Sequence, residues 1–457
     1  MTEKQLKRLE QYKRILIKEP VLFDTSEKIY KTFADDTANS HLVQRGIATY
    51  VIAPIVYSFV SWVLRDALLR GKKRLYFLAR DGYVMYHIAE MICKEIKLPI
   101  ECKYLYCSRY ALRSAQFSIL SERSLDYICL GGMDVTFEKI MDRAGLDENE
   151  AGRTARILGY QKKRTDEMSY NEVKSMKKVL KDCSYFMEKV YEHSRENYPL
   201  VIGYLKQEGF LEDVPFAIVD SGWTGSMQKS LQSLLNSMDK ASVIEGYYFG
   251  MYEYPMEMKK ENYHCYYFKP EKFLRRKVYF SNNLFECIYS SPEGMVTGYR
   301  VEKDKYIPVF EHPDNPNKER INYHTKVIKE YTKEMLVKNP RDIWEDKKNF
   351  LDIAEKLFFY FMGKPTVEEA REYGKYVFCD DVIGEKEQTV AASLSCREIK
   401  DNFLLSKSIN MLTKKGRPIK ESAWLEGSIM LNQDMGMRKL KHCALCKYAL
   451  YIKKRMK

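Results

Sequence analysis

The stretch that most constrains the fold is residues 215–231, PFAIVDSGWTGSMQKSL. Residues 216–219 form a short apolar run rich in strand-forming residues, and this run stops at Asp220. Small residues follow, and then residues that can form a helix. A strand that leads through a small-residue loop into a helix directs backbone N–H groups and the positive helix end at one place, which suits a phosphate. We therefore predict an anion site here, with an ordinary capped turn as the alternative.

The acid at the end of this strand limits the kind of ligand that the predicted site could bind. Asp220 would lie beside the anion rather than on it, so a ligand with both phosphate and hydroxyl groups fits better than phosphate alone. Sugar phosphates have this combination. The residues of this stretch that we predict to bind the substrate are Ser221, Gly222, Trp223, Thr224, Gly225, Ser226 and Gln228.

A second stretch, RLYFLARDGYVMYHIAE at residues 74–90, repeats the strand, loop and helix plan. Loops at the carboxyl ends of parallel strands converge on one crevice, so the two stretches are predicted to face a single ligand. In the turn that begins at Ala79, Arg80 can bind a phosphate with two hydrogen bonds, and Gly82 permits a close backbone approach. Asp81 could bind a metal or orient Arg80. The alternative is a structural Arg–Asp pair in a turn.

Two further groups could belong to the same site. Arg109 and Arg113 follow the apolar run at 104–108 and share a helix face, which could bind an anion or simply face solvent. Glu286 lies on an apolar segment, and Glu293 lies in a Ser-Ser-Pro-Glu-Gly turn. Either glutamate could act as a base or bind an acceptor hydroxyl, and either could equally be a cap or turn residue.

Changes in composition along the chain predict its organisation. The 19 uncharged residues between Arg45 and Arg65 are long enough to cross a bilayer, but they contain Pro54 and lead straight into a strand. We predict that they form a buried helix or helix pair. The predicted regions are an N-terminal helical segment at 1–40, an α/β core at 41–300 with a helical insertion at 134–210, a mainly helical region at 301–436, and a basic tail at 437–457.

The net charge of +13 predicts an anionic partner: a phosphorylated substrate, nucleic acid or an anionic membrane surface. The tail at 437–457 contains eight Lys or Arg and no acid, which suits peripheral contact with a membrane, where each basic residue adds about 1 kcal/mol. A disordered solubility tail is the alternative. Nucleic acid is disfavoured, because no basic stripe interleaved with aromatic residues occurs outside this tail.

The eleven cysteines form no regular framework, and the N-terminus lacks an apolar signal core, so a cytoplasmic location is predicted. Cys443 and Cys446 form an isolated CxxC, which does not support a four-ligand zinc site. The paired acids Asp380 and Asp381 could hold a metal, although such pairs are ordinary in turns.

Four segments of the chain resemble a known family: LYFLARDGY at 75–83, SRYALR at 108–113, IVDSGWTGSMQ at 218–228 and SSPEGMVTGY at 290–299. They are similar to a bacterial family labelled predicted HAD-superfamily hydrolase, which is found with surface-polysaccharide genes, and the resemblance covers roughly residues 40–450. Many members carry an amino-terminal HAD phosphatase domain ahead of such a region. HAD phosphatases need a strand followed by Asp-x-Asp, which this chain lacks, so the phosphatase domain is predicted to be missing and its activity is not expected.

The remaining region resembles a phosphoribosyltransferase, which implies an α/β fold with a Rossmann-like parallel sheet, a helical insertion and a mainly helical C-terminal region. In that resemblance Asp220 takes the ribose hydroxyls of phosphoribosyl diphosphate, residues 224–226 take its 5-phosphate, and residues 79–82 take its diphosphate. The chain departs from the pattern in having one acid where two are usual, and in placing Gly222 and Trp223 before the threonine.

The predicted function is that of a glycosyltransferase of phosphoribosyltransferase type, acting in capsule or O-antigen synthesis at the inner face of the membrane. It would transfer a phosphoribosyl group to a hydroxyl of a free or lipid-linked glycan, and a separate phosphatase partner would later remove the 5-phosphate. Mg²⁺, held by Asp81 and Asp220, would help Arg80 and backbone amides to stabilise the diphosphate. The residues predicted to be catalytic are Asp220, Arg80, Asp81 and Glu286. The alternatives are a HAD-like phosphohydrolase acting on a sugar phosphate and a non-catalytic scaffold in a glycan-assembly complex.

Overall fold

The structure of the protein is a computed structural model. It describes residues 2–34, 39–131, 135–238, 242–339, 348–378, 388–403, 422–432 and 437–455, together with residues 240, 406 and 420. Asp380 and Asp381, the predicted acid pair, lie outside the described residues.

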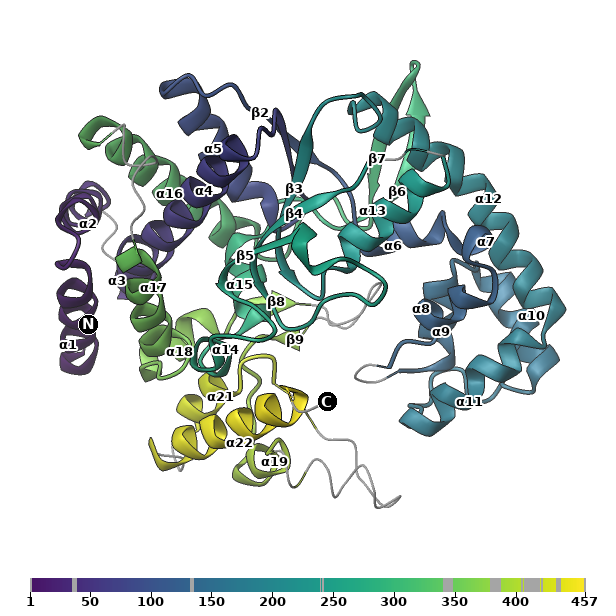
Figure 1. The fold of residues 1–457 in the computed structure, drawn as a ribbon. Coiled ribbons are helices and arrows are strands. Elements are labelled where there is room, and N and C mark those ends of the chain that lie inside the picture. Colours follow the sequence, from purple (N-terminus) through teal and green to yellow (C-terminus); the bar gives the residue numbers. More distant parts are fainter. Residues whose placement is uncertain are drawn as a thin grey trace.

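A five-stranded parallel sheet forms the centre of the molecule, with the strand order β2-β1-β3-β4-β5 (Figure 1). Its strands are β1 (Arg74–Leu78), β2 (Glu101–Leu105), β3 (Phe216–Trp223), β4 (Glu245–Met251) and β5 (Tyr263–Phe268). Every residue of β1 is buried, as expected for a strand covered by helices on both faces. The predicted α/β class with a parallel sheet is confirmed.

One face of the sheet receives Leu75 and Phe77 of β1, and the other receives Tyr76 and Leu78, because alternate side chains of a strand point to opposite faces. Helices cover both faces (Figure 1). The first face is covered by α4 (Ala53–Leu69), α5 (Gly82–Glu95), α15 (Asn282–Tyr289), α16 (Lys318–Lys338) and α17 (Lys348–Phe361). The second face is covered by α6 (Arg109–Ser114), the C-terminal half of α12 (Ser184–Gln207), α13 (Ser226–Asn236) and the hairpin of β6 (Val296–Glu302) and β7 (Lys305–Phe310).

The long uncharged run forms part of a helical segment that extends over residues 42–69. In its most apolar stretch of 18 residues, 94% is buried inside the protein. The predicted buried helix is therefore confirmed. The helical elements that surround it are α1 (Glu3–Leu16), α2 (Pro20–Thr32), α3 (Asn39–Ile47) and a π-helical turn (Ala48–Ile52).

The helical insertion has a hydrophobic core of its own, which reaches from Phe117 to Val190. It begins before the predicted position 134, because α7 (Phe117–Leu120) and α8 (Leu125–Ile128) share this core. Its other helices are α9 (Phe137–Ala144), α10 (Glu148–Leu158), α11 (Tyr170–Lys181) and the N-terminal half of α12. The apolar residues of this core between positions 173 and 190 are divided between α11 and α12.

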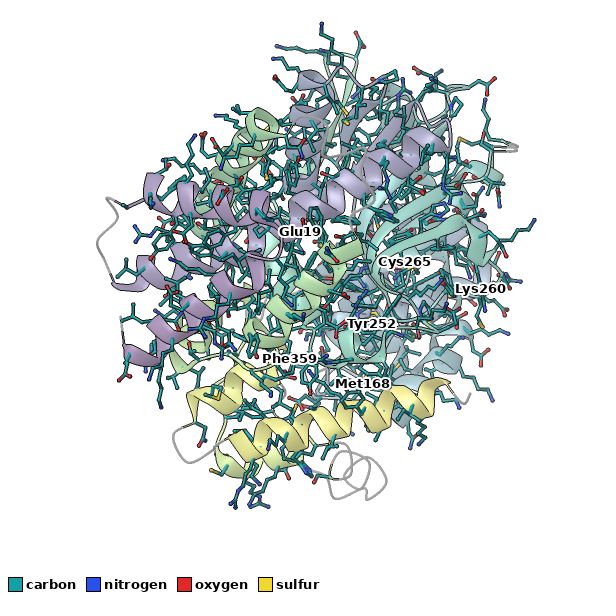
Figure 2. All side chains as sticks on the ribbon, turned by 60° about the vertical axis from the view of Figure 1, so that its left-hand side comes forward. Glu19, Met168, Tyr252, Lys260, Cys265 and Phe359 are labelled. Atoms are coloured by element: carbon teal, nitrogen blue, oxygen red, sulfur yellow. The ribbon has the colours of Figure 1, made fainter. Side chains whose placement is uncertain are left out.

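The C-terminal region packs beside α17 and the short α14 (Leu274–Val278). Its elements are α18 (Val367–Tyr373), β8 (Val377–Phe378), β9 (Gln388–Thr389), α19 (Cys396–Asp401), α21 (Leu425–Leu431) and α22 (Met437–Arg455). The last helix, drawn in yellow, lies along the body beside Tyr252 and Phe359 (Figure 2).

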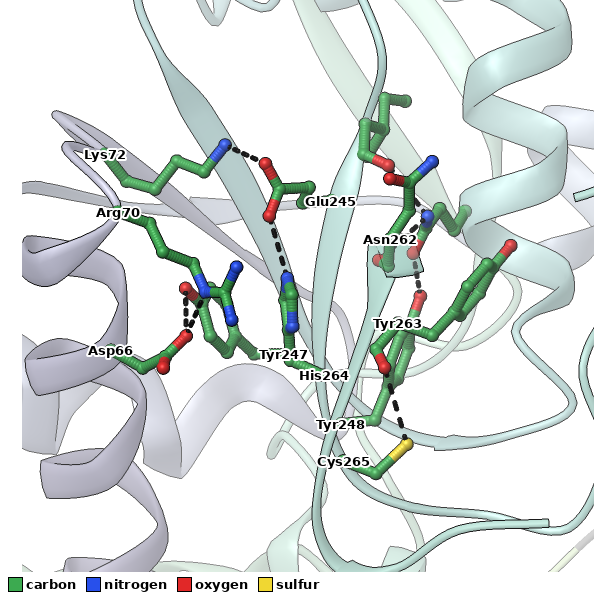
Figure 3. A network of polar contacts seen from close by, with 12 residues as sticks. Asp66, Arg70, Lys72, Glu245, Tyr247, Tyr248, Asn262, Tyr263, His264 and Cys265 are labelled. Atoms are coloured by element: carbon green, nitrogen blue, oxygen red, sulfur yellow. Dashed lines mark hydrogen bonds and ion pairs between the residues drawn. The ribbon is translucent and has the colours of Figure 1, made fainter. Parts of the chain in front are cut away.

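A polar network ties the amino ends of the strands together, on the side away from the cavity described below (Figure 3). Glu245 of β4 accepts hydrogen bonds from Lys72 Nζ at 2.5 Å and from His264 Nε2 of β5 at 2.7 Å. Beside it, the Tyr247 hydroxyl donates to Asp66 of α4 at 3.0 Å. Burial alone would raise the pKa of Glu245, but these hydrogen bonds lower it. The stabilisation is therefore complete at neutral pH and is lost only in acid, as the carboxylate protonates.

Replacing Glu245 with alanine is expected to lower the free energy of unfolding by about 2 kcal/mol, because Lys72 and His264 are left without their acceptor. Their side chains are only 11% and 10% exposed. Chemical denaturation at pH 7 measures the effect. The exposed Glu253→Ala variant is the control and should change stability by less than about 0.5 kcal/mol. Equal stability of both variants would show that the network contributes nothing.

Candidate functional site

A cavity of about 500 Å³ lies at the carboxyl ends of the strands. The chain leaves β1 toward β2 on one side of the sheet and leaves β3 toward β4 on the other, so the crevice between β1 and β3 is the switch point of the sheet. Ligands of open parallel sheets bind at such a point. Arg80 of the first predicted loop and Thr224 of the second both line the cavity, so the two stretches do meet there.

The end of β3 differs from the prediction. We predicted that the strand stops at Asp220, but its pairing with β4 continues to Trp223. Gly222 has a φ of +112°, and a Cβ atom there would lie 2.4 Å from the Gly250 carbonyl oxygen, so only glycine fits beside β4. Ser221, Gly222 and Trp223 therefore extend the strand, and only Thr224 and Gly225 form the loop before the next helix. Helix α13 then begins at Ser226, which lines the cavity and places the positive end of the helix there.

Three carboxylates converge on the cavity from different elements. Asp81 follows β1, Asp220 lies within β3, and Glu286 lies on α15. The Ser221 hydroxyl donates a hydrogen bond to Asp81. The indole Nε1 of Trp223 donates to Glu286 at 2.5 Å. Asp220, Ser221 and Trp223 all belong to β3. This strand therefore carries one of the acids and holds the other two by hydrogen bonds.

The electrostatics of these acids follow from their crowding. Burial, and then the nearby charge of Asp81, raise the pKa of Asp220 well above its usual range. The same two causes raise the pKa of Glu286 to about 7. Burial also raises the pKa of Asp81, although Ser221 and two arginines act against it. Such perturbed carboxyl groups in a cavity are typical of catalytic or ligand-binding sites.

Arg80 and Arg109 are exposed and line the cavity. Their charges oppose the raised pKa of Asp81, so they lie within electrostatic reach of it. Among the described residues, neither arginine has an acid within 4 Å to form an ion pair. Both guanidinium groups are therefore available to an anionic ligand.

Two of the predicted substrate-binding residues do not line the cavity because other parts of the fold enclose them. Arg113 is buried, and its guanidinium carbon lies 4.2 Å from the centre of the Tyr127 ring. Arg109, four residues earlier, lines the cavity, whereas the Arg113 side chain packs between α6 and the insertion. Gln228 is fully buried and donates to the Ile244 carbonyl oxygen at 2.8 Å, so it holds α13 against β4.

Two predicted glycines also lie outside the lining. A Cβ atom on Gly82 would lie 2.9 Å from the carbonyl carbon of Phe77, so Gly82 lets α5 pack on β1. Gly225 has a φ of +62° and begins α13 against Tyr263. Glycine is required at position 82 by packing and at position 225 by the backbone conformation. The remaining predicted residues do line the cavity: Ala79, Arg80, Asp81, Arg109, Asp220, Ser221, Gly222, Trp223, Thr224, Ser226 and Glu286.

One wall of the cavity, which was not predicted from the sequence, comes from residues 311–317, EHPDNPN. The sequence prediction placed this Pro-containing polar stretch in the mainly helical region at 301–436. Its two buried asparagines build the wall: Asn315 donates to the Ser290 hydroxyl at 3.2 Å, and Asn317 donates to the Val377 carbonyl oxygen at 2.7 Å. The density of amide, imidazole and acid groups within seven residues was the available signal. Asn282 and Asn283 of α15 also line the cavity and were missed.

The acid pair of Asp81 and Asp220 fits Mg²⁺, which proteins usually bind through one or two carboxylates together with phosphates of the substrate. Within the described ranges, no group of three or more His, Cys, Asp or Glu residues could hold a metal alone. Cys443 is buried, with its sulfur 3.7 Å from a carboxylate oxygen of Glu426.

The basic tail is a helix, α22, that packs on the body. Lys447 forms an ion pair with Glu426 at 2.5 Å, and the Tyr451 ring stacks on Tyr252 with ring centres 5.7 Å apart. The alternative of a disordered tail is therefore wrong. The outward side chains of Leu445 and Ile452 are 65% and 47% exposed. Contact of this face with a membrane stays a prediction.

Replacing Glu286 with glutamine is expected to stabilise the protein at high pH. Because the pKa of Glu286 in the folded protein, about 7, lies above that in the unfolded chain, the wild type loses stability as pH rises toward 7. The variant should equal the wild type near pH 4 and exceed it by about 3 kcal/mol at pH 8. Thermal unfolding in a metal chelator measures this, with the exposed Glu188→Gln as control. No gain at pH 8 would contradict the raised pKa.

The chain matches no model of a known protein family, and it matches none of the curated proteins. Its function therefore has to be argued from the cavity.

Proposed function

We propose that the protein transfers a phosphoribosyl group from phosphoribosyl diphosphate to a hydroxyl group of a glycan. The observation that carries this proposal is the meeting of two arginines, three crowded carboxylates and a helix N-terminus in one cavity at the switch point of a parallel sheet. Neither arginine forms an ion pair with any residue that the structure describes. A ligand that satisfies all of these groups must carry phosphates at two ends and hydroxyls between them. The phosphoribosyltransferase-like fold is part of the proposal.

The proposed donor would lie across the cavity. Arg80 and Arg109 would bind the diphosphate, and Thr224 with the start of α13 at Ser226 would bind the 5-phosphate. Asp220 lies between these two groups along the chain and would accept hydrogen bonds from the ribose hydroxyls. Its negative charge would also stabilise the positive charge that develops on the sugar as the diphosphate departs.

In the proposed reaction, the acceptor oxygen forms a bond to ribose C1 while the bond from C1 to the diphosphate oxygen breaks. The diphosphate leaves with the bonding electron pair, and the hydroxyl proton of the acceptor passes to a base. Glu286 lines the cavity, whereas Glu293 does not, which favours Glu286 as that base. A carboxyl pKa of about 7 suits a base that works near neutral pH.

Mg²⁺ would be held by Asp81 and Asp220 and, when bound, would neutralise charge on the diphosphate. The hydrogen bond from Ser221 orients the Asp81 carboxylate toward this role. Phosphoribosyltransferases usually have two acids at the position of Asp220, where this chain has one. Asp81, in the loop after β1, would supply the second acid.

The alternatives fit the cavity less well. A hydrolase of the HAD type needs Asp-x-Asp after a strand, with the first aspartate as nucleophile and the second as acid/base. Asp81 is followed by Gly82 and Tyr83, so the acid/base aspartate is missing. A scaffold has no need for three carboxylates whose pKa values are raised by burial in a cavity. Such an arrangement costs stability and is usually kept for chemistry.

Isothermal titration calorimetry tests the proposed donor. We expect the wild type with Mg²⁺ to bind phosphoribosyl diphosphate, and to bind ribose 5-phosphate and diphosphate more weakly, because each offers only one end of the ligand. The exposed Arg195→Ala variant should behave as the wild type. If the wild type binds none of the three compounds, the proposal is wrong.

A further inference from the structure

A group of half-exposed aromatic rings lies at the edge of the sheet, beside the cavity. We call Tyr83, Tyr86, Tyr104, Tyr106 and Phe310 the aromatic patch. The Tyr104 ring is central: its centre lies 5.7 Å from that of Tyr83, 5.9 Å from that of Tyr86 and 4.9 Å from that of Tyr106. Tyr106 in turn lies 5.7 Å from Phe310. The rings are only partly exposed, since they also pack against the cores on the two faces of the sheet, and their exposed edges could contact a ligand.

The patch continues directly into the wall of the cavity. Tyr106 immediately precedes Cys107, and Phe310 immediately precedes Glu311, and both of these following residues line the cavity. Tyr83 comes two residues after Asp81. Tyr83 and Tyr86 lie on α5, Tyr104 lies on β2, Tyr106 follows that strand, and Phe310 ends β7. The patch therefore adjoins the cavity lining along two segments of the chain.

A carboxylate accompanies the rings. Glu293 immediately precedes Gly294, which lines the cavity. Burial raises the pKa of Tyr83, Tyr104 and Tyr106, and the charge of Glu293 raises each of them further, so the carboxylate lies within reach of all three phenols. Its Oε2 atom is buried and has no hydrogen-bond partner among the described residues. A carboxylate oxygen without a partner is costly, so Glu293 has an unmet requirement for a hydrogen-bond donor.

We propose that the aromatic patch and Glu293 bind the acceptor as a neutral sugar ring. The C–H face of a sugar can pack on aromatic rings, and its hydroxyls can donate to Glu293. A phosphate or a nucleic acid would be repelled by this carboxylate. The inference rests on the proposed function in naming the acceptor, although sugar binding by the patch can be measured without the donor.

Saturation-transfer NMR on the full chain tests this inference, with methyl glycosides of glucose, galactose, mannose and N-acetylglucosamine as probes. At least one glycoside should receive saturation, strongest at the protons of its C–H face. In Tyr106→Ala and in Glu293→Gln the signal should fall at least about tenfold, the loss expected for a stacked ring or a charged hydrogen bond. Tyr170→Ala, which removes a 68% exposed tyrosine in the insertion, is the matched control.

Calorimetry with phosphoribosyl diphosphate separates the two proposals. Sugar binding without binding of phosphoribosyl diphosphate would support the patch as a sugar site and would contradict the proposed donor. Donor binding by the wild type and both variants, without saturation of any glycoside, would overturn the patch as a sugar site. Equal saturation in the wild type and both variants would overturn it too. So would self-association in sedimentation experiments that disappears in Tyr106→Ala, because the patch would then be a protein interface.

Discussion

Replacing Arg80 and Arg109 together with alanine is expected to weaken the binding of phosphoribosyl diphosphate by about a thousandfold. Each guanidinium group makes charge-assisted hydrogen bonds to a phosphate that are worth about 2 kcal/mol, and two such losses amount to about three powers of ten. The fold should survive, because both side chains are exposed and neither forms an ion pair among the described residues.

Calorimetry at constant Mg²⁺ concentration measures this loss. The Arg113→Ala variant is informative as a contrast, because its guanidinium packs on Tyr127 and lies outside the cavity lining. It should lose stability but keep its affinity for the donor. If Arg113→Ala lost as much affinity as the double variant at a temperature where it stays folded, the cavity would not be the donor site.

Replacing Asp220 with asparagine is expected to lower the rate of phosphoribosyl transfer by about a thousandfold, the usual effect of removing one group that stabilises the transition state electrostatically. Asparagine keeps the size and a hydrogen-bonding oxygen, so the affinity for the donor should fall much less than the rate. The raised pKa of Asp220 adds a second readout. Removing its charge should stabilise the unliganded protein at pH 8.

Single-turnover measurements separate the rate of transfer from the affinity for the donor. The exposed Glu188→Gln again serves as the control. A variant that kept the wild-type rate would show that Asp220 does not act on the departing group. A variant that failed to fold would be revealed by circular dichroism.

The parallel sheet and the two site loops could be predicted because the local chemistry is strong there. Residues 75–78 and 216–219 are unbroken apolar runs, and each is followed by polar and small residues. The carboxyl ends of parallel strands share one edge, so the meeting of Arg80 with Thr224 followed from topology alone.

The features of the fold and the site that could not be predicted depend on contacts between segments that are distant in the sequence. The strand beyond Asp220 continues only because Gly222 fits against Gly250, and no local pattern reports that partner. Arg109 and Arg113 share a helix spacing, but the insertion covers only the second. The wall at 311–317 consists of ordinary turn residues, and their place in the cavity is decided by hydrogen bonds to Ser290 and Val377.

The most direct test of the central claim is the product of the reaction. The wild type, phosphoribosyl diphosphate, Mg²⁺ and an acceptor glycoside selected by the NMR experiment are incubated and analysed by mass spectrometry, with diphosphate assayed in parallel. The account predicts a glycoside heavier by one phosphoribosyl group, and one diphosphate released for each product formed. Release of inorganic phosphate from the donor, with the glycoside unchanged, would contradict it.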